Sequence, residues 1–391
     1  MGYCYQVYTG GTAGRGVTFQ DILDKLPASG DISDLIVGWS EDRAVYEALR
    51  EHTRRHGIRL WLWFPVFSEH GTQADFPQQI SISTGAPFGA ALFDGDETFD
   101  FCCPSEESVI SKLLSIYDKF YSGIGFDGIF LDRIRYPSMT MGLDALFGCQ
   151  CSRCQAWFEN HGLTPQAVRS SYEALLVRVQ DPSCDDPLGI WAYENGTYRL
   201  ADGTLQQLIS LRCRRITDTV GCLAAQFRER GLLVGLDLFA PFLAPFVGQD
   251  YKALSAMADF VKPMLYRLTD TPAGIGFELG AMARALSTGS AHQERVERRL
   301  KSLYGIEGDG FSFFRREVET VALHAAALPY VRFAPGIEIH TVAHRPPILP
   351  DQIRRNVRLL ETLGFSERVA CWDILSAPEE AIRTFIHEDK E

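Results

Sequence analysis

Short apolar runs recur along the chain, and each is bounded by glycine, proline or charged residues. A run of this kind is typical of a strand buried on both faces, because helices cover each side of a parallel sheet. The pattern predicts eight strands, at 3–8, 35–39, 58–64, 129–131, 232–239, 260–266, 331–339 and 369–375.

Segments in which apolar residues recur with helical spacing separate these runs. The longer helices are predicted at 41–56, 105–121, 205–231, 278–304, 315–328, 350–363 and 378–387. An α/β chain of eight strands alternating with helices is what a closed (β/α)8 barrel, or TIM barrel, requires. The pattern therefore predicts one barrel domain spanning residues 1–391, without a linker that divides it.

The length beyond a minimal barrel of ~250 residues lies in long loops after the third and fourth strands. These insertions, at about 68–104 and 137–203, fall on the face where TIM barrels carry their active sites. The rival fold, an open doubly wound sheet, would have a phosphate-binding loop after its first strand. The glycine-rich segment 10–16 fits neither phosphate-loop pattern.

Composition and charge are those of a globular protein that binds neither nucleic acid nor membranes. Of the 391 residues, 46% are hydrophobic and 23% are charged, as in an ordinary globular protein. The net charge of −12 argues against nucleic acid and anionic membranes as partners, since both bind basic surfaces. No apolar run approaches the ~20 residues of a membrane span, and the amino terminus lacks the features of a signal peptide. We therefore expect a cytoplasmic protein, and its oligomeric state stays open, a homo-oligomer included.

Three of the ten cysteines form the pattern C-x-C-x2-C at Cys149, Cys151 and Cys154. Three thiolates at this spacing can face one ion, and Zn2+ takes four ligands in a tetrahedron. Candidates for the fourth ligand are Cys102, Cys103, Cys184 and His161. Barrel topology favours the pair after the third strand, because that loop neighbours the loop that carries the triplet. A closed site of four thiolates would be structural, whereas four unliganded surface thiols would be prone to oxidation.

Carboxylates stand at the ends of four predicted strands: Asp132, Asp237, Glu338 and Asp373. Paired carboxylates carry out glycoside hydrolysis, in which one group is ionised and the other holds a proton near neutral pH. Asp132, Glu338 and Asp237 are accordingly the catalytic candidates.

The residues beside Asp132 and Glu338 suggest which carboxyl group is the ionised one and which is the acid/base. Arg133 and Arg135 stand beside Asp132 and favour its ionised form. Glu338 lies in an apolar stretch, which favours a raised pKa and suits the acid/base. The structural alternatives are that Asp132 pairs with an arginine to hold its loop and that Glu338 is the buried partner of an arginine.

Aromatic and polar residues mark the same strand ends. Aromatic faces suit the C–H faces of sugar rings, and the polar tips of these side chains suit hydroxyl groups. The residues expected to bind substrate are Trp39, Trp63, Arg135, Tyr136, Tyr266, His340, Trp372 and Asp373. Taken singly, each aromatic residue is better explained as part of the hydrophobic core, because aromatics dominate cores.

Two motifs carry a resemblance to known families. Residues 126–137, Phe-Asp-Gly-Ile-Phe-Leu-Asp-Arg-Ile-Arg-Tyr-Pro, resemble the fourth-strand signature of the "hypothetical glycosyl hydrolase" barrels, DGI-x-x-D-x-x-x-YP. The cysteine pattern is similar to that of the zinc-containing β-galactosidases of clan A, in which a Cys-Pro after strand three joins a C-x-C-x2-C after strand four. The resemblance implies a zinc site made of Cys103, Cys149, Cys151 and Cys154, followed by the aromatic pair Trp157 and Phe158.

One departure from clan A bears on catalysis. In those enzymes the acid/base is a glutamate just past the fourth-strand aspartate, and Ile134 holds that position here. That role cannot be carried over, and the resemblance would make Glu338 the nucleophile. Barrel α-galactosidases and α-fucosidases use an aspartate nucleophile on strand four, which keeps Asp132 in that role by analogy. The division of roles between the two carboxylates stays open.

The sequence therefore predicts a glycoside hydrolase with a structural Zn2+, acting on a small oligosaccharide or glycoside with retention of configuration. Two other classes are considered. A non-catalytic carbohydrate-binding barrel is favoured by Ile134 at the acid position. A metal-dependent sugar deacetylase or amidohydrolase would need a second, catalytic metal at the barrel centre.

Overall fold

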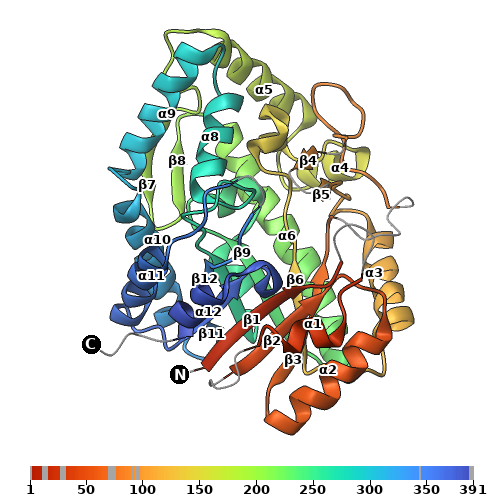
Figure 1. Ribbon diagram of the computed structural model, residues 1–391. Helices are drawn as coiled ribbons and strands as arrows, with labels where there is room; N and C mark the ends of the chain where they lie inside the picture. The colour runs from red at the N-terminus through yellow and green to blue at the C-terminus, as the bar shows by residue number, and fades with distance from the viewer. Residues whose placement is uncertain are drawn as a thin grey trace.

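The computed structural model describes residues 2–10, 16–26, 32–68, 76–89, 91–93, 97–342 and 345–386. Its centre is a closed barrel of parallel strands, with helices packed around the outside (Figure 1). The barrel strands are β1 Gly2–Tyr8, β2 Ile32–Gly38, β3 Arg59–Pro65, β6 Gly128–Asp132, β9 Leu233–Phe239, β10 Phe260–Met264, β11 Arg332–Phe333 with β12 Gly336–Glu338, and β13 Glu367–Cys371. The predicted α/β fold, a (β/α)8 TIM barrel, is confirmed.

The seventh strand of the barrel is interrupted. β11 and β12 both pair with β10, and β12 also pairs with β13. Pro335 lies between them, and a proline has no N–H to donate to a ladder. The predicted run 331–339 is therefore two short strands, and the direct pairing of β9 with β10 completes the ring.

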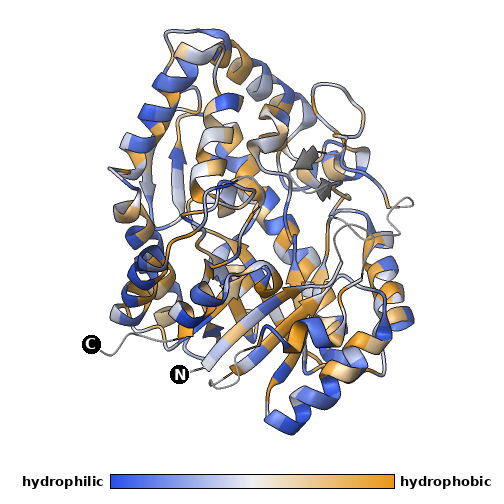
Figure 2. Cartoon of the chain, viewed as in Figure 1, coloured by the Kyte–Doolittle hydropathy of each residue, from blue (hydrophilic) through white to orange (hydrophobic). Residues whose placement is uncertain are grey.

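Amphipathic helices cover the outside of the barrel. They are α1 Phe19–Leu23, α2 Arg43–His56, α3 Glu107–Phe120, α6 Gly203–Glu229, α7 Tyr251–Ser255, α10 Phe311–Ala327, α11 Pro350–Thr362 and α12 Glu379–Ile386. Figure 2 shows β2 and β3 mostly hydrophobic and the outer surface of α2 mostly hydrophilic. Among the described residues, no helix is both long and apolar enough to cross a membrane.

Insertions occupy the upper half of Figure 1, beyond one end of the barrel. They come from the loops after β3, β6 and β10. Their elements are β4 Ala91–Phe93, β5 Glu97–Phe99, η2 Met139–Met141, η3 Leu143–Phe147, α4 Ser152–Glu159, α5 Pro165–Gln180, β7 Ile190–Glu194, β8 Thr197–Leu200, α8 Ile275–Ala285 and α9 Ser290–Tyr304, and two further 3-10 turns are η4 Ala244–Val247 and η5 Ile374–Ser376. The predicted helix 278–304 is thus two helices, with Gly289 at a φ of 72° between them.

Aromatic side chains fill the interior of the barrel. The Phe260 ring lies 5.4 Å from the Trp61 ring and 5.7 Å from the Phe130 ring, measured between centroids. Gly235 leaves room for them, because a Cβ at that position would lie 2.7 Å from the Phe130 ring. This layer is the floor beneath the strand ends that carry the charged residues.

Candidate active site

Three ionisable side chains lie at one level on adjacent strands, above this aromatic floor. Asp237 on β9 is in register with Lys262 on β10. On the neighbouring strands β6 and β9, Phe130 is in register with Gly235. Asp132 lies two residues after Phe130, and Asp237 lies two residues after Gly235, so the two carboxylates are at the same level. Residues two apart on a strand face the same side, so all three point into the barrel.

Asp132 is partly exposed, and two donors hold its carboxylate. The Trp63 indole Nε1 donates to its Oδ2 at 2.9 Å, and the Arg133 backbone N–H donates to its Oδ1 at 2.5 Å. These two hydrogen bonds fix the orientation of the carboxylate. The Arg133 guanidinium stacks on the Trp39 ring, with 4.4 Å from its Cζ to the ring centroid, and the Trp39 and Trp63 rings lie 5.3 Å apart.

Lys262 and Asp237 form a buried ion pair at the barrel centre. The Lys262 Nζ lies 2.8 Å from Asp237 Oδ2 and also donates to Gln6 Oε1 at 2.7 Å and to Tyr266 Oη at 3.1 Å. Burial, with a smaller contribution from the Asp132 charge, raises the pKa of Asp237 to about 8 despite the opposing effect of the Lys262 ammonium. These contacts give the ammonium a full set of acceptors.

Glu338 ends β12 and is fully buried. Its Oε1 accepts from the backbone N–H groups of Leu268 and, at 3.1 Å, Thr269, both in the loop after β10. Burial raises the pKa of Glu338 to about 7, although these amides act in the opposite direction. A carboxyl group in this state can hold a proton near neutral pH, which suits a general acid.

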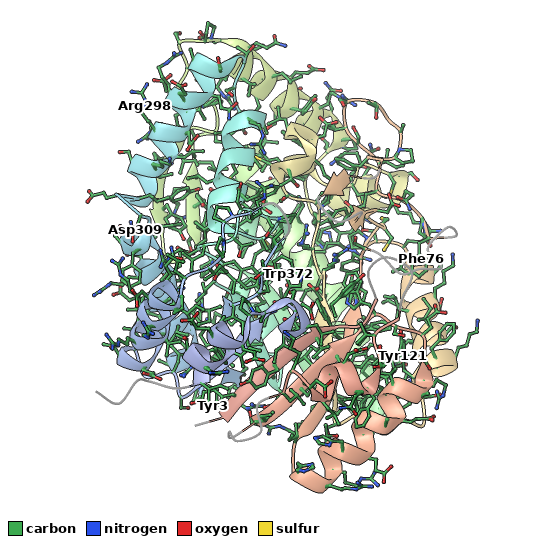
Figure 3. All side chains as sticks on the ribbon, viewed as in Figure 1. Tyr3, Phe76, Tyr121, Arg298, Asp309 and Trp372 are labelled. Atoms are coloured by element: carbon green, nitrogen blue, oxygen red, sulfur yellow. The ribbon has the colours of Figure 1, made fainter. Side chains whose placement is uncertain are left out.

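His340 and Trp372 stand beside Glu338's strand. Their rings lie 3.7 Å apart between centroids, and the Tyr266 ring lies 6.4 Å from Trp372. Figure 3 shows Trp372 near the middle of the molecule. His340 Nδ1 donates to the Cys371 carbonyl at 2.8 Å, and burial lowers the pKa of His340 to about 4. The imidazole is therefore neutral, and its Nε2 is an acceptor.

Several of these side chains carry a buried polar atom that has no partner among the described residues. The atoms are Gln6 Nε2, Trp39 Nε1, Asp237 Oδ1, Glu338 Oε2 and His340 Nε2. An unmade hydrogen bond at a buried group is costly, and such groups in native structures call for an explanation. Unpartnered donors and acceptors on side chains of the barrel strands and of the loops that follow them suit a ligand rich in hydroxyl groups, since a hydroxyl both donates and accepts.

Three of the predicted substrate-binding residues make contacts with other parts of the protein. Tyr136 is fully buried and stacks against the Arg212 guanidinium, with 4.6 Å from Cζ to the ring centroid. Asp373 Oδ1 accepts from the Tyr8 and Leu375 backbone N–H groups at 3.2 Å and so begins η5. Arg135 lies between two aromatic rings and donates to a backbone carbonyl.

Lys262 and Gln6 were not among the predicted site residues, although both lie at the centre of the site. The available signal was a polar residue in the middle of a buried strand, in Phe260–Met264 and in Gly2–Tyr8. A lysine flanked by apolar residues on a buried strand is costly unless it is paired. That cost would have marked Lys262 as the partner of an inward carboxylate.

Four cysteine sulfurs form a separate cluster above β3 and β6. The Sγ atoms of Cys103, Cys149, Cys151 and Cys154 all lie within 4.8 Å of one another. Cys103 Sγ is 3.7 Å from that of Cys149, 3.7 Å from that of Cys151 and 3.5 Å from that of Cys154. Four thiolates around one Zn2+ at ~2.3 Å would lie about 3.8 Å apart, so the arrangement fits a tetrahedral ion.

Backbone donors point at these sulfurs. The N–H groups of Ser105, Ile80 and Cys154 donate to the sulfurs of Cys103, Cys149 and Cys151 at 3.4–3.5 Å. Such donors stabilise thiolate charge. Among the described residues, no other group of three or more Cys, His, Asp or Glu side chains lies close enough to hold a metal.

Comparison with known proteins places the fold. No protein-family model matches the chain, and no curated protein sequence matches it. Among solved structures, the glycoside hydrolase domain of PgaB (BpsB) from Bordetella bronchiseptica aligns over 95% of this chain and 92% of its own, with 14% identity and a TM-score of 0.55. α-L-Fucosidase isoenzyme 2 from Paenibacillus thiaminolyticus aligns over 98% and 48%, with 12% identity and a TM-score of 0.49. At these identities the likeness shows the barrel fold alone.

Proposed function

We propose that the protein is a retaining glycoside hydrolase with Asp132 and Glu338 as its catalytic pair, acting on a small oligosaccharide or glycoside. The observation that carries this proposal is that one barrel presents a partly exposed, oriented carboxylate, a buried carboxyl group and several unpartnered polar atoms on its strands and the loops that follow them. The half-buried Trp39 and Trp372 offer aromatic surface beside them. The coarse likeness to a glycoside hydrolase domain agrees with this reading of the site.

The proposed chemistry uses each carboxyl group in two steps. Asp132 attacks the anomeric carbon while Glu338 gives its proton to the glycosidic oxygen, so the leaving group departs as an alcohol and a glycosyl ester forms on Asp132. In the second step Glu338 takes a proton from water, and the resulting hydroxide displaces Asp132 from the sugar. The anomeric configuration of the substrate is retained, and both carboxyl groups return to their starting states.

Glu338 suits the acid better than Asp237 does. Burial raises the pKa of Asp237 to about 8, but its Oδ2 is held in an ion pair with Lys262, and protonation there would break that pair and leave a buried ammonium without its counterion. Glu338 meets only backbone amides at its Oε1, and its Oε2 has no partner among the described residues. In this proposal Lys262 balances Asp237 and helps to hold Gln6 and Tyr266 in place around the substrate.

We also propose that Cys103, Cys149, Cys151 and Cys154 bind one structural Zn2+. The sulfur spacing and the three N–H···S contacts support this ion. A closed set of four thiolates leaves no position for water, so the metal would tie the loop after β3 to the loop after β6 and take no part in hydrolysis.

The decisive variant is Asp132→Asn. We expect turnover of aryl glycosides to fall by roughly 10²–10⁴-fold, because the amide cannot act as the nucleophile, while the fold is kept. The measurement is release of the chromophore across a panel of aryl glycosides, with the anomer of the first product read by NMR. Azide added to Asp132→Ala should restore turnover by replacing the missing nucleophile.

Asp127→Asn is the matched control, because Asp127 immediately precedes β6, at the end of the strand opposite Asp132, and pairs with Arg50 at 2.6 Å. It should keep wild-type turnover. A fully active Asp132→Asn protein would refute the assignment. Binding of sugars without turnover of any glycoside would favour the second candidate, a carbohydrate-binding barrel, which Ile134 at the usual acid position supports.

A further inference from the structure

An open groove runs between α10 and α11 on the outside of the barrel. It has a volume of about 720 Å3 and is lined mainly by Phe311, Arg315, Asp351, Arg354, Arg355 and Arg358. None of these residues belongs to the candidate active site. The groove is therefore a separate feature, and the question is what it binds.

Its lining is strongly positive in a chain of net charge −12. Four arginines face one aspartate there, and Arg354 is already paired with that aspartate, Asp351. The exposed Arg315 and Arg358 have no ion-pair partner among the described residues. Arg358 stands one helical turn beyond Arg354 on α11, a spacing at which like charges are unfavourable.

The Phe311 ring fixes the guanidinium groups that surround it. Arg355 Cζ lies 3.7 Å from the ring centroid, Arg267 Cζ 5.2 Å and Arg315 Cζ 5.9 Å. A guanidinium stacked on an aromatic face loses less freedom when it binds, and its planar N–H fork matches carboxylate and phosphate oxygens.

Asp309 shows how this cluster holds an oxyanion. Its Oδ2 accepts from Arg355 Nη1 at 2.6 Å and lies 3.9 Å from Arg267 Nη1. Figure 3 shows Asp309 at the left edge of the molecule. This carboxylate satisfies one end of the cluster, and Arg315 and Arg358 have no equivalent among the described residues.

We propose that this arginine groove binds a small ligand that carries two or more oxyanion groups, of the phosphate or carboxylate kind. Two groups are needed because Arg358 lies on α11 and Arg315 on the facing helix α10, so one guanidinium is offered from each side of the groove. A bidentate guanidinium contact is available to each. This proposal stands apart from the proposed hydrolysis and does not depend on it.

Calorimetric titration of the full chain at low ionic strength tests the groove, with inorganic pyrophosphate and citrate as probes. We expect saturable binding of one probe molecule per chain. The double variant Arg315→Ala, Arg358→Ala should weaken that binding by more than tenfold. Tighter binding of pyrophosphate than of citrate would assign the phosphate class, and the reverse order would assign the carboxylate class.

Two further variants sharpen the test. Asp309→Asn removes the competing carboxylate and should tighten binding several-fold, while the amide oxygen still accepts from the Phe311 N–H as Asp309 Oδ1 does. Arg298→Ala on α9 is the matched control, because Arg298 is also exposed but lies outside the groove. The proposal fails if the wild-type protein shows no saturable binding, if the double variant binds as the wild type does, or if Arg298→Ala loses affinity to the same extent.

Discussion

At the scale of single residues, three carboxyl groups of one chemical type have three environments. Asp132 is partly exposed and accepts two hydrogen bonds, Asp237 is buried against Lys262, and Glu338 is buried against backbone amides. Burial disfavours the charged form, whereas donors and cations favour it. For the two buried groups burial outweighs the donors, which raises the pKa of Asp237 to about 8 and that of Glu338 to about 7.

The assignment of Glu338 as acid predicts the basic side of the pH–rate profile. Its pKa is raised to about 7, so the protonated fraction falls as pH rises through 7 and the rate should fall with it. Glu338→Gln should lower turnover by roughly 10²–10⁴-fold for substrates with poor leaving groups, and by less for activated aryl glycosides, which need no acid. The measurement is kcat/KM against pH for both substrate types.

Glu317→Gln is the control for this profile. Burial also raises the pKa of Glu317 to about 7, but the residue lies on α10 and binds the Tyr193 hydroxyl and the Phe242 N–H. Its profile should match that of the wild type. If Asp237→Asn, and not Glu338→Gln, removed the basic limb, Asp237 would be the acid.

At the scale of elements, the loop after β3 and the loop after β6 contact each other and form one unit, called the cap below. Cys103 belongs to the loop after β3, and the other three cysteines belong to the loop after β6. Beside the sulfurs, Arg153 pairs with Glu106 at 2.7 Å, and the Gln150 N–H donates to the Ile80 carbonyl at 2.8 Å. The cap is therefore joined by backbone, ionic and sulfur contacts at one place.

Removal of the proposed Zn2+ should loosen the contact between these two loops. We expect one zinc per chain by elemental analysis, and a strong chelator or Cys151→Ser should lower the free energy of unfolding by about 3 kcal/mol or more, as loss of a tightly bound ligand does. Proteolysis within the loops after β3 and β6 should rise. The measurement is thermal unfolding with and without chelator, followed by mapping of the cleavage sites.

Cys222→Ser, at an exposed position on α6, should change neither zinc content nor stability. A wild-type protein without zinc, or unfolding that a chelator does not affect, would count against the structural site. Such a result would leave the proposed hydrolysis unaffected, because the four cysteines lie outside the catalytic pair.

A hairpin in the second insertion was not among the predicted strands. β7 and β8 are joined by Asn195 and Gly196, both at positive φ, and Asn-Gly is a strong signal for a two-residue hairpin turn. The signal was present in the sequence, but its surroundings are rich in turn residues and obscured it. The hairpin contributes Tyr193 and Tyr198 to a buried aromatic cluster with Tyr304.

At the scale of the whole molecule, Asp34 ties the amino-terminal end of the barrel together. It is fully buried on β2, and its carboxylate accepts from Arg59 on β3 at 2.7 Å, from Arg332 on β11 at 2.8 Å and from the Trp61 indole at 2.7 Å. β2 and β11 are not neighbours in the sheet, so the contact spans the barrel.

These donors outweigh burial and lower the pKa of Asp34 to about 2. A carboxyl group whose pKa is lowered by folding stabilises the protein above its unfolded pKa of ~3.9, and this contribution is lost as pH falls through 2. The difference corresponds to about 2.5 kcal/mol. Urea unfolding at pH 7 and pH 2.5 should show that Asp34→Asn loses less stability on acidification than the wild type does.

Asp218→Asn, which affects a largely exposed pair with Arg214 at 3.9 Å, is the control and should keep the wild-type dependence on pH. Equal acid losses in the wild type and in Asp34→Asn would show that Asp34 does not carry this part of the stability.

The sequence by itself determined the features that repeat or cluster along the chain. Eight apolar runs predicted eight strands, because a strand covered on both faces must be apolar, and C-x-C-x2-C predicted the sulfur cluster, because local spacing sets which sulfurs can converge. The single-domain extent of 1–391 stays a prediction. The strand-end carboxylates were likewise readable as candidates.

Only the tertiary structure decided how residues far apart in the chain meet. In the folded chain Lys262 contacts Asp237 and Gln6. The Arg212 guanidinium stacks on the Tyr136 ring, and the Tyr8 N–H donates to the Asp373 carboxylate. The arginine groove likewise needs two helices side by side. Local periodicity records which face a side chain takes, whereas its partners, and so its charge state, depend on which elements pack against that face.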